Sequence, residues 1–305
     1  MNKPLSLILT LGLALGAAAA GAADKERPVD ERRPLKADAR VEVSNVAGDI
    51  TVEAWDRNEL HLTGLLSEQV EKLEITGNES RLKIEVKLPK RTRNVDDTIL
   101  HLKVPAGIAL VATGVSADID VRGIRGDVEA STVSGDIELD VGSKNVEARS
   151  VSGEVTVRAP SAMTRVESVS GDIIVHGVRG EVRGETVSGD VEVRAQAARR
   201  VQIKSVSGDL EVHADLTADA EVEAKTMSGD VRLNVPQLPD VEIDLETYSG
   251  EIAPSELLPG LRRGKRHSRD DDDDEHEGRE YTREGKGPGR VRLHSFSGDI
   301  VVRKK

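Results

Sequence analysis

The feature that most constrains the fold is a four-residue pattern, Val-Ser-Gly-Asp or a close variant, that returns at nearly constant intervals. Its glycine stands at Gly135, Gly153, Gly171, Gly189, Gly208, Gly229, Gly250 and Gly298. Successive glycines are 18, 18, 18, 19, 21, 21 and 48 residues apart, and Ala117 extends the series 18 residues upstream. A period of this length indicates one supersecondary unit that repeats and stacks on its own copies, rather than an ordinary layered globule.

Apolar and polar residues alternate on both sides of each glycine. Apolar residues stand two and four positions after it, as at Ile137 and Leu139, and seven and five positions before it, as at Val128 and Ala130. Alternation with a period of two predicts a half-buried strand on each side of the corner. The residue two positions before the glycine, such as Val169, is predicted to point inward too. The chain is expected to bend before that residue, because the parity of the pattern changes there.

Two strands alone cannot satisfy their own backbone, so the same strands of the next repeat must supply the hydrogen-bond partners. Aromatic residues make up only 1% of the chain, which fits a narrow interior filled with aliphatic side chains. The sequence therefore predicts an all-β fold, a single right-handed parallel β-helix (β-solenoid) with 18–21 residues per coil. The corner glycine suits a positive φ, and the acidic residue after it suits the turn as a hydrogen-bond acceptor.

The beginning of the chain predicts export. Lys3 precedes an apolar run over 5–15, and small residues with an A-x-A site at 20–22 follow. This is typical of a secretory signal peptide, and the apolar part is too short to span a bilayer, so no membrane span is expected after cleavage. The chain contains no cysteine, so stability cannot come from disulfides. The expected location is periplasmic or on the cell surface.

The repeats and the composition predict the domain organisation. Charged runs at 262–266 and 270–275 predict a disordered loop, inserted between the two strands of one coil. The expected regions are a signal peptide (1–23), a flexible linker (24–37) and a β-solenoid (38–305). The solenoid is divided into less regular N-terminal coils (38–115), regular repeats (116–252), the charged loop (253–290) and a final coil (291–305).

No catalytic residue, cofactor or metal site is predicted. None of the seven histidines forms a close ligand pair on an expected strand, and no G-x-S-x-G nucleophile motif is present. A net charge of −12 disfavours nucleic acid as a partner. We therefore expect a protein that is not an enzyme.

One column of polar residues is the candidate binding face. The serine and the acidic residue of each corner should stack at about 4.8 Å from coil to coil. A solvated turn column is the favoured interpretation, and a cation-binding or ligand-binding face is the alternative. The candidate residues are Ser134, Asp136, Ser152, Glu154, Ser170, Asp172, Ser188, Asp190, Ser207, Asp209, Ser228 and Asp230.

The chain resembles a bacterial putative-adhesin family of otherwise unknown function whose members are exported β-helices. The resemblance rests on V-S-N-V-A-G-D-I-T-V at 43–52 with Trp55 shortly after, on L-K-V-P-A-G at 102–107, and on the serial Ser-Gly-Asp corners. It implies a cell-envelope location and an adhesive role, and it supplies no catalytic residues.

The predicted function is thus a non-catalytic cell-envelope protein with an adhesin-like binding or scaffold role. Envelope polysaccharides or surface proteins are the expected partners, and the chain is expected to be monomeric. Two alternatives stay open at this point. One is a carbohydrate-active enzyme on a β-helix, although such an enzyme usually needs aromatic sugar platforms that are missing here. The other is a self-assembling, bactofilin-like filament, although charge at 303–305 disfavours strand addition.

Overall fold

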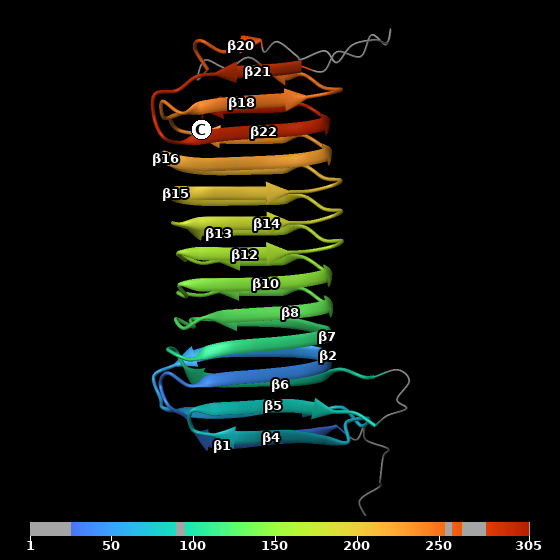
Figure 1. Cartoon of the computed structure of the whole chain (residues 1–305). Coiled ribbons are helices and arrows are strands. Elements are labelled where there is room, and N and C mark those ends of the chain that lie inside the picture. Colours follow the sequence, from blue (N-terminus) through green and yellow to red (C-terminus); the bar gives the residue numbers. More distant parts are fainter. Residues whose placement is uncertain (1–25, 90–94, 254–257, 264–278, 305) are drawn as a thin grey trace, which may run out of the picture.

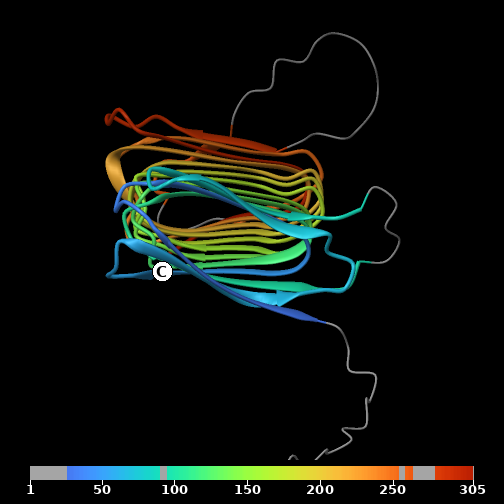
Figure 2. The same cartoon turned by 90° about the horizontal axis from the view of Figure 1, so that it is seen from below.

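A computed structural model of the chain describes residues 26–89, 95–253, 258–263 and 279–304. The expected signal peptide lies outside the described residues, as does half of the expected charged loop, at 254–257 and 264–278. Strands stack like rungs along one axis (Figure 1), and the view along that axis shows the coils superimposed around a common interior (Figure 2). The strands are β1 (Arg27–Pro34), β2 (Arg40–Trp55), β3 (Glu59–Leu66), β4 (Lys72–Asn78), β5 (Arg81–Lys87), β6 (Thr98–Pro105), β7 (Ala109–Arg122), β8 (Val128–Ser134), β9 (Ile137–Asp140), β10 (Asn145–Ser152), β11 (Val155–Arg158), β12 (Met163–Glu167), β13 (Ile173–Val178), β14 (Glu181–Glu185), β15 (Val191–Lys204), β16 (Leu210–Ser228), β17 (Val231–Val235), β18 (Glu242–Thr247), β19 (Ile252–Ala253), β20 (Arg262–Arg263), β21 (Arg279–Arg283), β22 (Arg290–Ser297) and β23 (Ile300–Lys304).

The central coils confirm the predicted parallel stacking. Each coil pairs with the next in the register set by the repeat, so that Val146 of β10 lies beside Val128 of β8. In the second row of strands, Val155 of β11 lies beside Ile137 of β9. Both predicted sets of inward positions are buried, from Val128 and Ala130 to Ile300 and Val302. The interior is therefore a continuous aliphatic column, as expected for strands that share one buried face.

The prediction that the residue two before the corner glycine points inward is wrong. Val169 keeps 45% of its surface exposed, whereas Ser168 before it is buried. β12 ends at Glu167, but the alternation of inward and outward residues continues beyond it. A serine or threonine therefore takes the inward position and the valine takes the outward one.

The N-terminal end differs from the regular coils that the sequence suggested. β2 forms one coil, with Ile50 beside Ile119 of β7, and pairs on its other side with β5 and β6. Beyond this coil, β3 pairs antiparallel with β6, β1 with β3, and β4 with β5. The expected flexible linker, 24–37, thus contains strand β1, because its backbone finds partners along β3 and its Val29 packs against the core. Folded-back strands cover an edge that the last parallel coil would leave unpaired.

The coil that comes last in the sequence is not the last coil in space. β22 lies between β16 and β18, so residues 290–304 insert between the coil of 221–235 and the coil of 242–253. The charged insert therefore joins two coils instead of interrupting one. Part of it, β21, pairs antiparallel with β18 and carries Tyr281 against the core. The expectation of a wholly disordered insert does not hold for these residues, because β18 offers them an open edge.

The fold is thus an all-β stack with parallel pairing at its centre and antiparallel strands at both ends, which corrects the expectation of a purely parallel helix. The right-handed turn of the coils stays a prediction. In the part of the chain that the structure describes, no helix has the length and apolar character needed to cross a bilayer.

Candidate functional site

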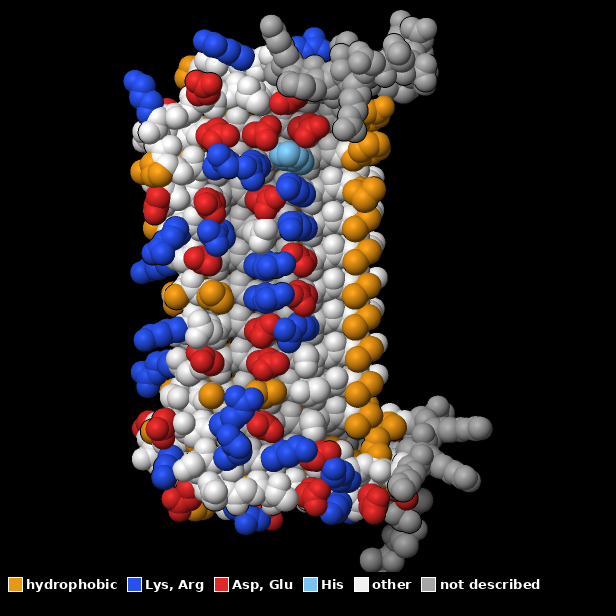
Figure 3. Space-filling view, in the orientation of Figure 1, with side chains coloured by type: hydrophobic (Ala, Val, Ile, Leu, Met, Phe, Trp, Pro, Cys, Tyr) orange, Lys and Arg blue, Asp and Glu red, His pale blue; other side chains and the backbone are white. Residues whose placement is uncertain are grey.

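The outward residue two positions before each corner glycine forms a line of exposed apolar side chains, which we call the apolar ridge. Parallel pairing of the serines that follow, such as Ser152 with Ser170, aligns these side chains from coil to coil at about 4.8 Å. Each ridge side chain is 45–58% exposed. The space-filling view shows a column of hydrophobic side chains along one edge of the stack (Figure 3). The ridge consists of Val115, Val133, Val151, Val169, Val187, Val206, Met227 and Phe296.

The ridge broadens at its C-terminal end. Tyr248, which occupies the equivalent position in the next coil, stacks on Phe296 with the ring centroids 4.8 Å apart and the planes 6° from parallel. Offset stacking of this kind stabilises two rings that are otherwise partly in water. Two rings and Met227 therefore replace the valines where the ridge ends.

Beside the ridge lies a row of buried serine and threonine residues, the hydroxyl row. All of their hydroxyls except that of Ser168, which is buried without a hydrogen-bond partner, donate a hydrogen bond to the carbonyl oxygen of the corner residue one coil below. Thr226 bonds Gly208 in this way at 3.2 Å, and Ser295 bonds Gly229 at 2.9 Å. These bonds satisfy the carbonyl groups that the corner turns away from the strand ladder. They explain why an inward polar residue occurs here. The row consists of Thr132, Ser150, Ser168, Thr186, Ser205, Thr226, Thr247 and Ser295.

A row of charged side chains, the charged row, faces the ridge across the hydroxyl row. Most of its members are held by neighbouring charges: Arg149 lies 3.2 Å from Glu167, and Lys225 lies 2.5 Å from Glu223. These contacts are exposed to solvent, so each stabilises the fold by less than about 1 kcal/mol. The row consists of Arg149, Glu167, Glu185, Lys204, Lys225, His294 and Glu246.

Together the three rows form an open groove of about 1200 Å³ that runs along the coils from Thr132 to Tyr248. The apolar ridge is one wall, the hydroxyl row is the floor and the charged row is the other wall (Figure 3). Ligand sites are commonly concave and mainly apolar, with a few polar groups that fix orientation. The groove has this character, and none of the twelve candidate residues from the sequence lines it.

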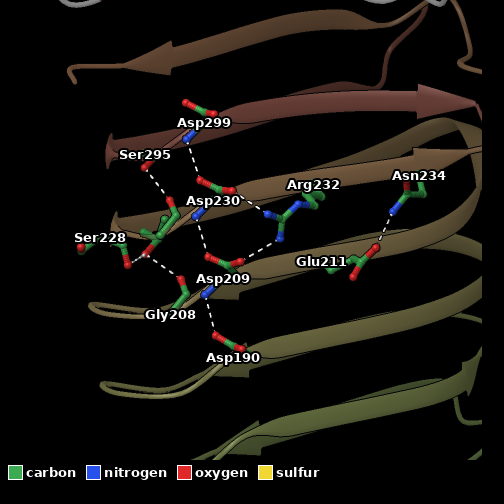
Figure 4. Close-up of polar contacts among 12 residues, drawn as sticks. Asp190, Gly208, Asp209, Glu211, Ser228, Asp230, Arg232, Asn234, Ser295 and Asp299 are labelled. Carbon is green, nitrogen blue, oxygen red and sulfur yellow. Dashed lines mark hydrogen bonds and ion pairs between the residues drawn. The ribbon is translucent and has the colours of Figure 1, made fainter. Parts of the chain in front are cut away.

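The acidic column that the sequence singled out lies on the other side of the ridge. Its carboxylates accept hydrogen bonds from the backbone N–H of the acidic residue in the next coil, as from Asp190 to Asp172 and from Asp230 to Asp209, both at 2.8 Å. The same bond recurs at 2.7–2.9 Å along the stack, and Figure 4 shows the part of the series that joins Asp190, Asp209, Asp230 and Asp299. A carboxylate that accepts such a bond is stabilised in place. These distances favour the structural role of the column.

Glu154 shows why aspartate predominates in the column. Its longer side chain turns back to accept a hydrogen bond from the hydroxyl of Thr156 at 2.9 Å. The candidate serines, such as Ser152 and Ser170, pair through their backbones and leave their side chains exposed. Among the residues that the structure describes, no three His, Asp or Glu side chains come together in a way that could hold a metal ion.

One carboxylate of the column has a shifted pKa. Burial raises the pKa of Asp209, but the N–H of Asp230 and the guanidinium of Arg232 outweigh that effect, and the net pKa lies below the usual range. Arg232 bridges two coils, with its nitrogens 2.8 Å from Asp209 and 2.5 Å from Asp230 (Figure 4). An arginine between two stacked carboxylates relieves the repulsion between them.

Sequence reasoning missed the groove because it placed the ridge valines inside. A signal was present: serine or threonine stands three positions before the corner glycine in every coil from Thr132 onward, directly before the apolar residue. A small polar residue in the phase of the inward positions indicates that the next residue points outward.

The fold is similar to solved structures of bacterial proteins. A putative adhesin from Bacteroides fragilis NCTC 9343 has 10% sequence identity and a TM-score of 0.50, and the match covers 93% of this chain and 100% of that chain. A putative lipid binding protein from Parabacteroides distasonis ATCC 8503 has 15% identity and a TM-score of 0.51, over 91% of this chain and 96% of that chain. At these identities the likeness shows the fold alone. No curated protein matches the chain.

The family comparison covers nearly all of the stacked coils. The family model described as Toastrack DUF4097 matches residues 35–303. That span runs from the strands that cover the N-terminal end to the inserted coil near the C-terminus. The chain belongs to the Toastrack DUF4097 family.

Proposed function

We propose that this chain is a non-catalytic, exported protein of the cell envelope that binds an apolar partner along the apolar ridge and its groove. The observation that carries the proposal is the unbroken line of eight exposed apolar side chains from Val115 to Phe296. Single exposed apolar residues are common, but a contiguous apolar patch on a soluble protein marks an interaction site. Water leaves such a surface when a partner covers it, which makes binding favourable.

The names of the structural neighbours support a binding role. One neighbour is described as a putative adhesin and another as a putative lipid binding protein.

The acidic column supports a non-catalytic role. Its carboxylates accept hydrogen bonds from backbone N–H groups and repeat once per coil. A glycosidase instead needs two carboxyl groups set across a substrate cleft. The absence of catalysis is tested by incubating the protein with envelope polysaccharides and analysing the products. Cleavage of a polysaccharide would contradict a non-catalytic role.

The ends of the stack disfavour an end-to-end filament. β4 and β1 lie at one end and β20 and β21 at the other (Figure 1), where antiparallel pairing replaces the parallel ladder. A filament made of continuous parallel coils would need open parallel edges at both ends.

The apolar dye bis-ANS tests the proposed binding surface. We expect saturable fluorescence enhancement with the exported protein, and a dissociation constant at least about tenfold weaker in the triple variant Val151→Thr/Val169→Thr/Val187→Thr. Threonine has nearly the shape of valine and these positions are exposed, so the fold should persist. Leu65→Thr is the matched control, because Leu65 is exposed but lies on β3 outside the groove. Equal dye binding by the triple variant and the wild type would contradict the proposal.

Export has its own test. In a bacterial host, fractionation should place the full chain in the periplasm or on the surface, with a mature N-terminus near residue 24. Retention of residues 1–23 on a cytoplasmic protein would contradict this part of the proposal.

A further inference from the structure

The groove is long, narrow and amphipathic, and these properties restrict what can occupy it. It follows consecutive coils from Thr132 to Tyr248, with one row of apolar side chains on one wall and one row of charges on the other. Its volume of about 1200 Å³ exceeds the range of roughly 300–1,000 Å³ that is usual for small-molecule sites, because the groove extends over several coils. An occupant must therefore be slender, and apolar along one side.

An extended peptide fits this surface poorly. Side chains on one face of a strand repeat every two residues, at roughly 6.6–6.8 Å, whereas the ridge repeats at about 4.8 Å. The two spacings fall out of step within a few residues. A hydrocarbon chain has no side-chain repeat and can lie against ridge residues such as Val169 and Val187 in any register.

A second copy of the protein has a rigid ridge of its own, whose side chains repeat at the same interval of about 4.8 Å, so self-association is an outcome that the experiment must distinguish. The floor of the groove is the hydroxyl row between the two walls. A flexible hydrocarbon chain can reach that floor.

The charged row supplies a place for a head group. Glu167 and Glu185 each accept a hydrogen bond from the arginine two positions earlier on the same strand. These bonds, from Arg165 and from Arg183, are both 2.7 Å long. Lys204 instead has the neutral Gln202 at that position, and Gln202 bonds Glu223 at 2.7 Å. Among the described residues Lys204 makes no ion pair. In the ladder, Lys204 lies between Glu185, which is held by Arg183, and Lys225, which is paired with Glu223. An anion placed there therefore meets the ammonium group of Lys204, with that of Lys225 beside it.

We infer that the groove binds a single-chain lipid with an anionic head group, with the head at Lys204 and Lys225 and the acyl chain along the ridge from Val206 toward Val133. Four ladder intervals of about 4.8 Å make roughly 19 Å, the length of an extended sixteen-carbon chain. This inference rests on the proposed function, because it names the ligand class of the same groove. It goes further in fixing the head group and the direction of the chain.

Palmitate is the probe, and binding to the exported protein is measured by equilibrium dialysis below its aggregation concentration. Each fully buried methylene contributes a factor of about four in affinity, and the groove is open on one side, so laurate should bind at least about tenfold more weakly. Hexadecyltrimethylammonium, which has the same chain and a cationic head, should also bind at least about tenfold more weakly. Equal binding of palmitate and the cationic amphiphile would overturn the head-group assignment.

Variants separate the two parts of the site. Val151→Thr/Val169→Thr/Val187→Thr should weaken palmitate binding at least about tenfold, and Lys204→Gln about fivefold. Leu65→Thr and Lys103→Gln, which alter exposed residues outside the groove, should stay within about twofold of wild type. Unchanged melting curves would show that every variant is folded.

The outcomes also separate this inference from the proposed function. If the triple variant loses bis-ANS binding while palmitate never binds, the lipid assignment fails and the binding surface stands. If the triple variant binds bis-ANS and palmitate as the wild type does, both the binding surface and the lipid assignment fail. Self-association that depends on the ridge, seen by sedimentation velocity without palmitate binding, would overturn the lipid assignment in favour of a second copy. Palmitate binding that depends on chain length, the ridge and Lys204 supports it.

Discussion

The backbone N–H of Asp190 donates a hydrogen bond to Oδ1 of Asp172, one coil below, at 2.8 Å. This contact lies in the column that the sequence presented as a candidate binding face. It gives the acidic residue a structural task, because the corner turns that N–H away from the strand ladder and a carboxylate from the previous coil satisfies it. A regular column of surface charge can thus arise from backbone geometry alone.

Replacing Asp172 tests that task. Asp172→Ala should lower the free energy of unfolding by about 1–2 kcal/mol, because the N–H of Asp190 loses its acceptor. Asp172→Asn keeps an acceptor oxygen and should cost less than half as much. Urea denaturation followed by circular dichroism measures both. Asp215→Ala, at an exposed position outside the column, is the control and should change stability by less than about 0.5 kcal/mol. Equal effects of Asp172→Ala and Asp215→Ala would contradict the structural task.

Calcium should not stabilise the protein specifically. The carboxylates of the column already accept backbone hydrogen bonds, and oxygen-rich flexible sites are what calcium prefers. We expect the same melting temperature in calcium, in magnesium and at matched ionic strength. A calcium-specific increase that disappears in Asp172→Asn/Asp190→Asn would restore the cation-binding interpretation of the column.

The corner glycines allow the coils to approach one another. A Cβ added at Gly171 would lie 2.1 Å from the carbonyl oxygen of Gly153 in the coil below, which no real contact allows. Gly171→Ala should therefore cost at least about 3 kcal/mol, since the backbones of two coils must move apart. Gly142→Ala is a matched control, because the atom nearest to its new methyl group would be Cγ of Arg125 at 3.4 Å. Similar melting temperatures for the two variants would show that the corner tolerates separation.

Much of this fold could be predicted from the sequence because it depends on local periodicity. Ile137, Leu139 and their equivalents indicate an inward face through simple alternation, and the corner glycines indicate the stacking through their spacing. The direction of Val169 was mispredicted because valine was assumed to be buried. The decisive neighbour, Ser168, is polar yet buried.

The order of the last coils could not be predicted, for a different reason. The coils around Gly250 and Gly298 carry the same pattern, so either could stack on the coil around Gly229. Long-range pairing selects the second: the N–H of Asp299 bonds Asp230 at 2.9 Å, and the N–H of Glu251 bonds Asp299 at 2.8 Å. Asp299 thus donates a hydrogen bond to the acidic residue of the coil below and accepts one from the acidic residue of the coil above. Periodicity alone contains no such information.

Acid should weaken the contribution of Asp209. Its pKa is lowered in the folded protein from an ordinary value of 3.8, since the N–H of Asp230 and Arg232 outweigh burial. A lowered carboxyl pKa contributes stability that is present above the unfolded value and is lost as the pH falls through the folded value. Asp209→Asn should thus cost up to about 1 kcal/mol at pH 7, a figure reduced by solvent screening, and progressively less below pH 3.8.

Urea denaturation of the wild type and Asp209→Asn at pH 7 and at pH 2.5 checks this prediction. Asp215→Asn, at an exposed position, serves as the control at both pH values. A stability difference between wild type and Asp209→Asn that grows on acidification would contradict the assigned sign.

The central claim is that the residue before each corner serine points outward and forms a binding ridge. The chain contains no cysteine, so single thiols can be placed at Val169 on the ridge and at Val175 in the interior. With a maleimide reagent under native conditions, Val169→Cys should react at the rate of an exposed thiol. Val175→Cys should react at least about a hundredfold more slowly, because it needs local unfolding. Saturating palmitate should protect Val169→Cys. Slow labelling of Val169→Cys without ligand, at a rate similar to that of Val175→Cys, would contradict the account.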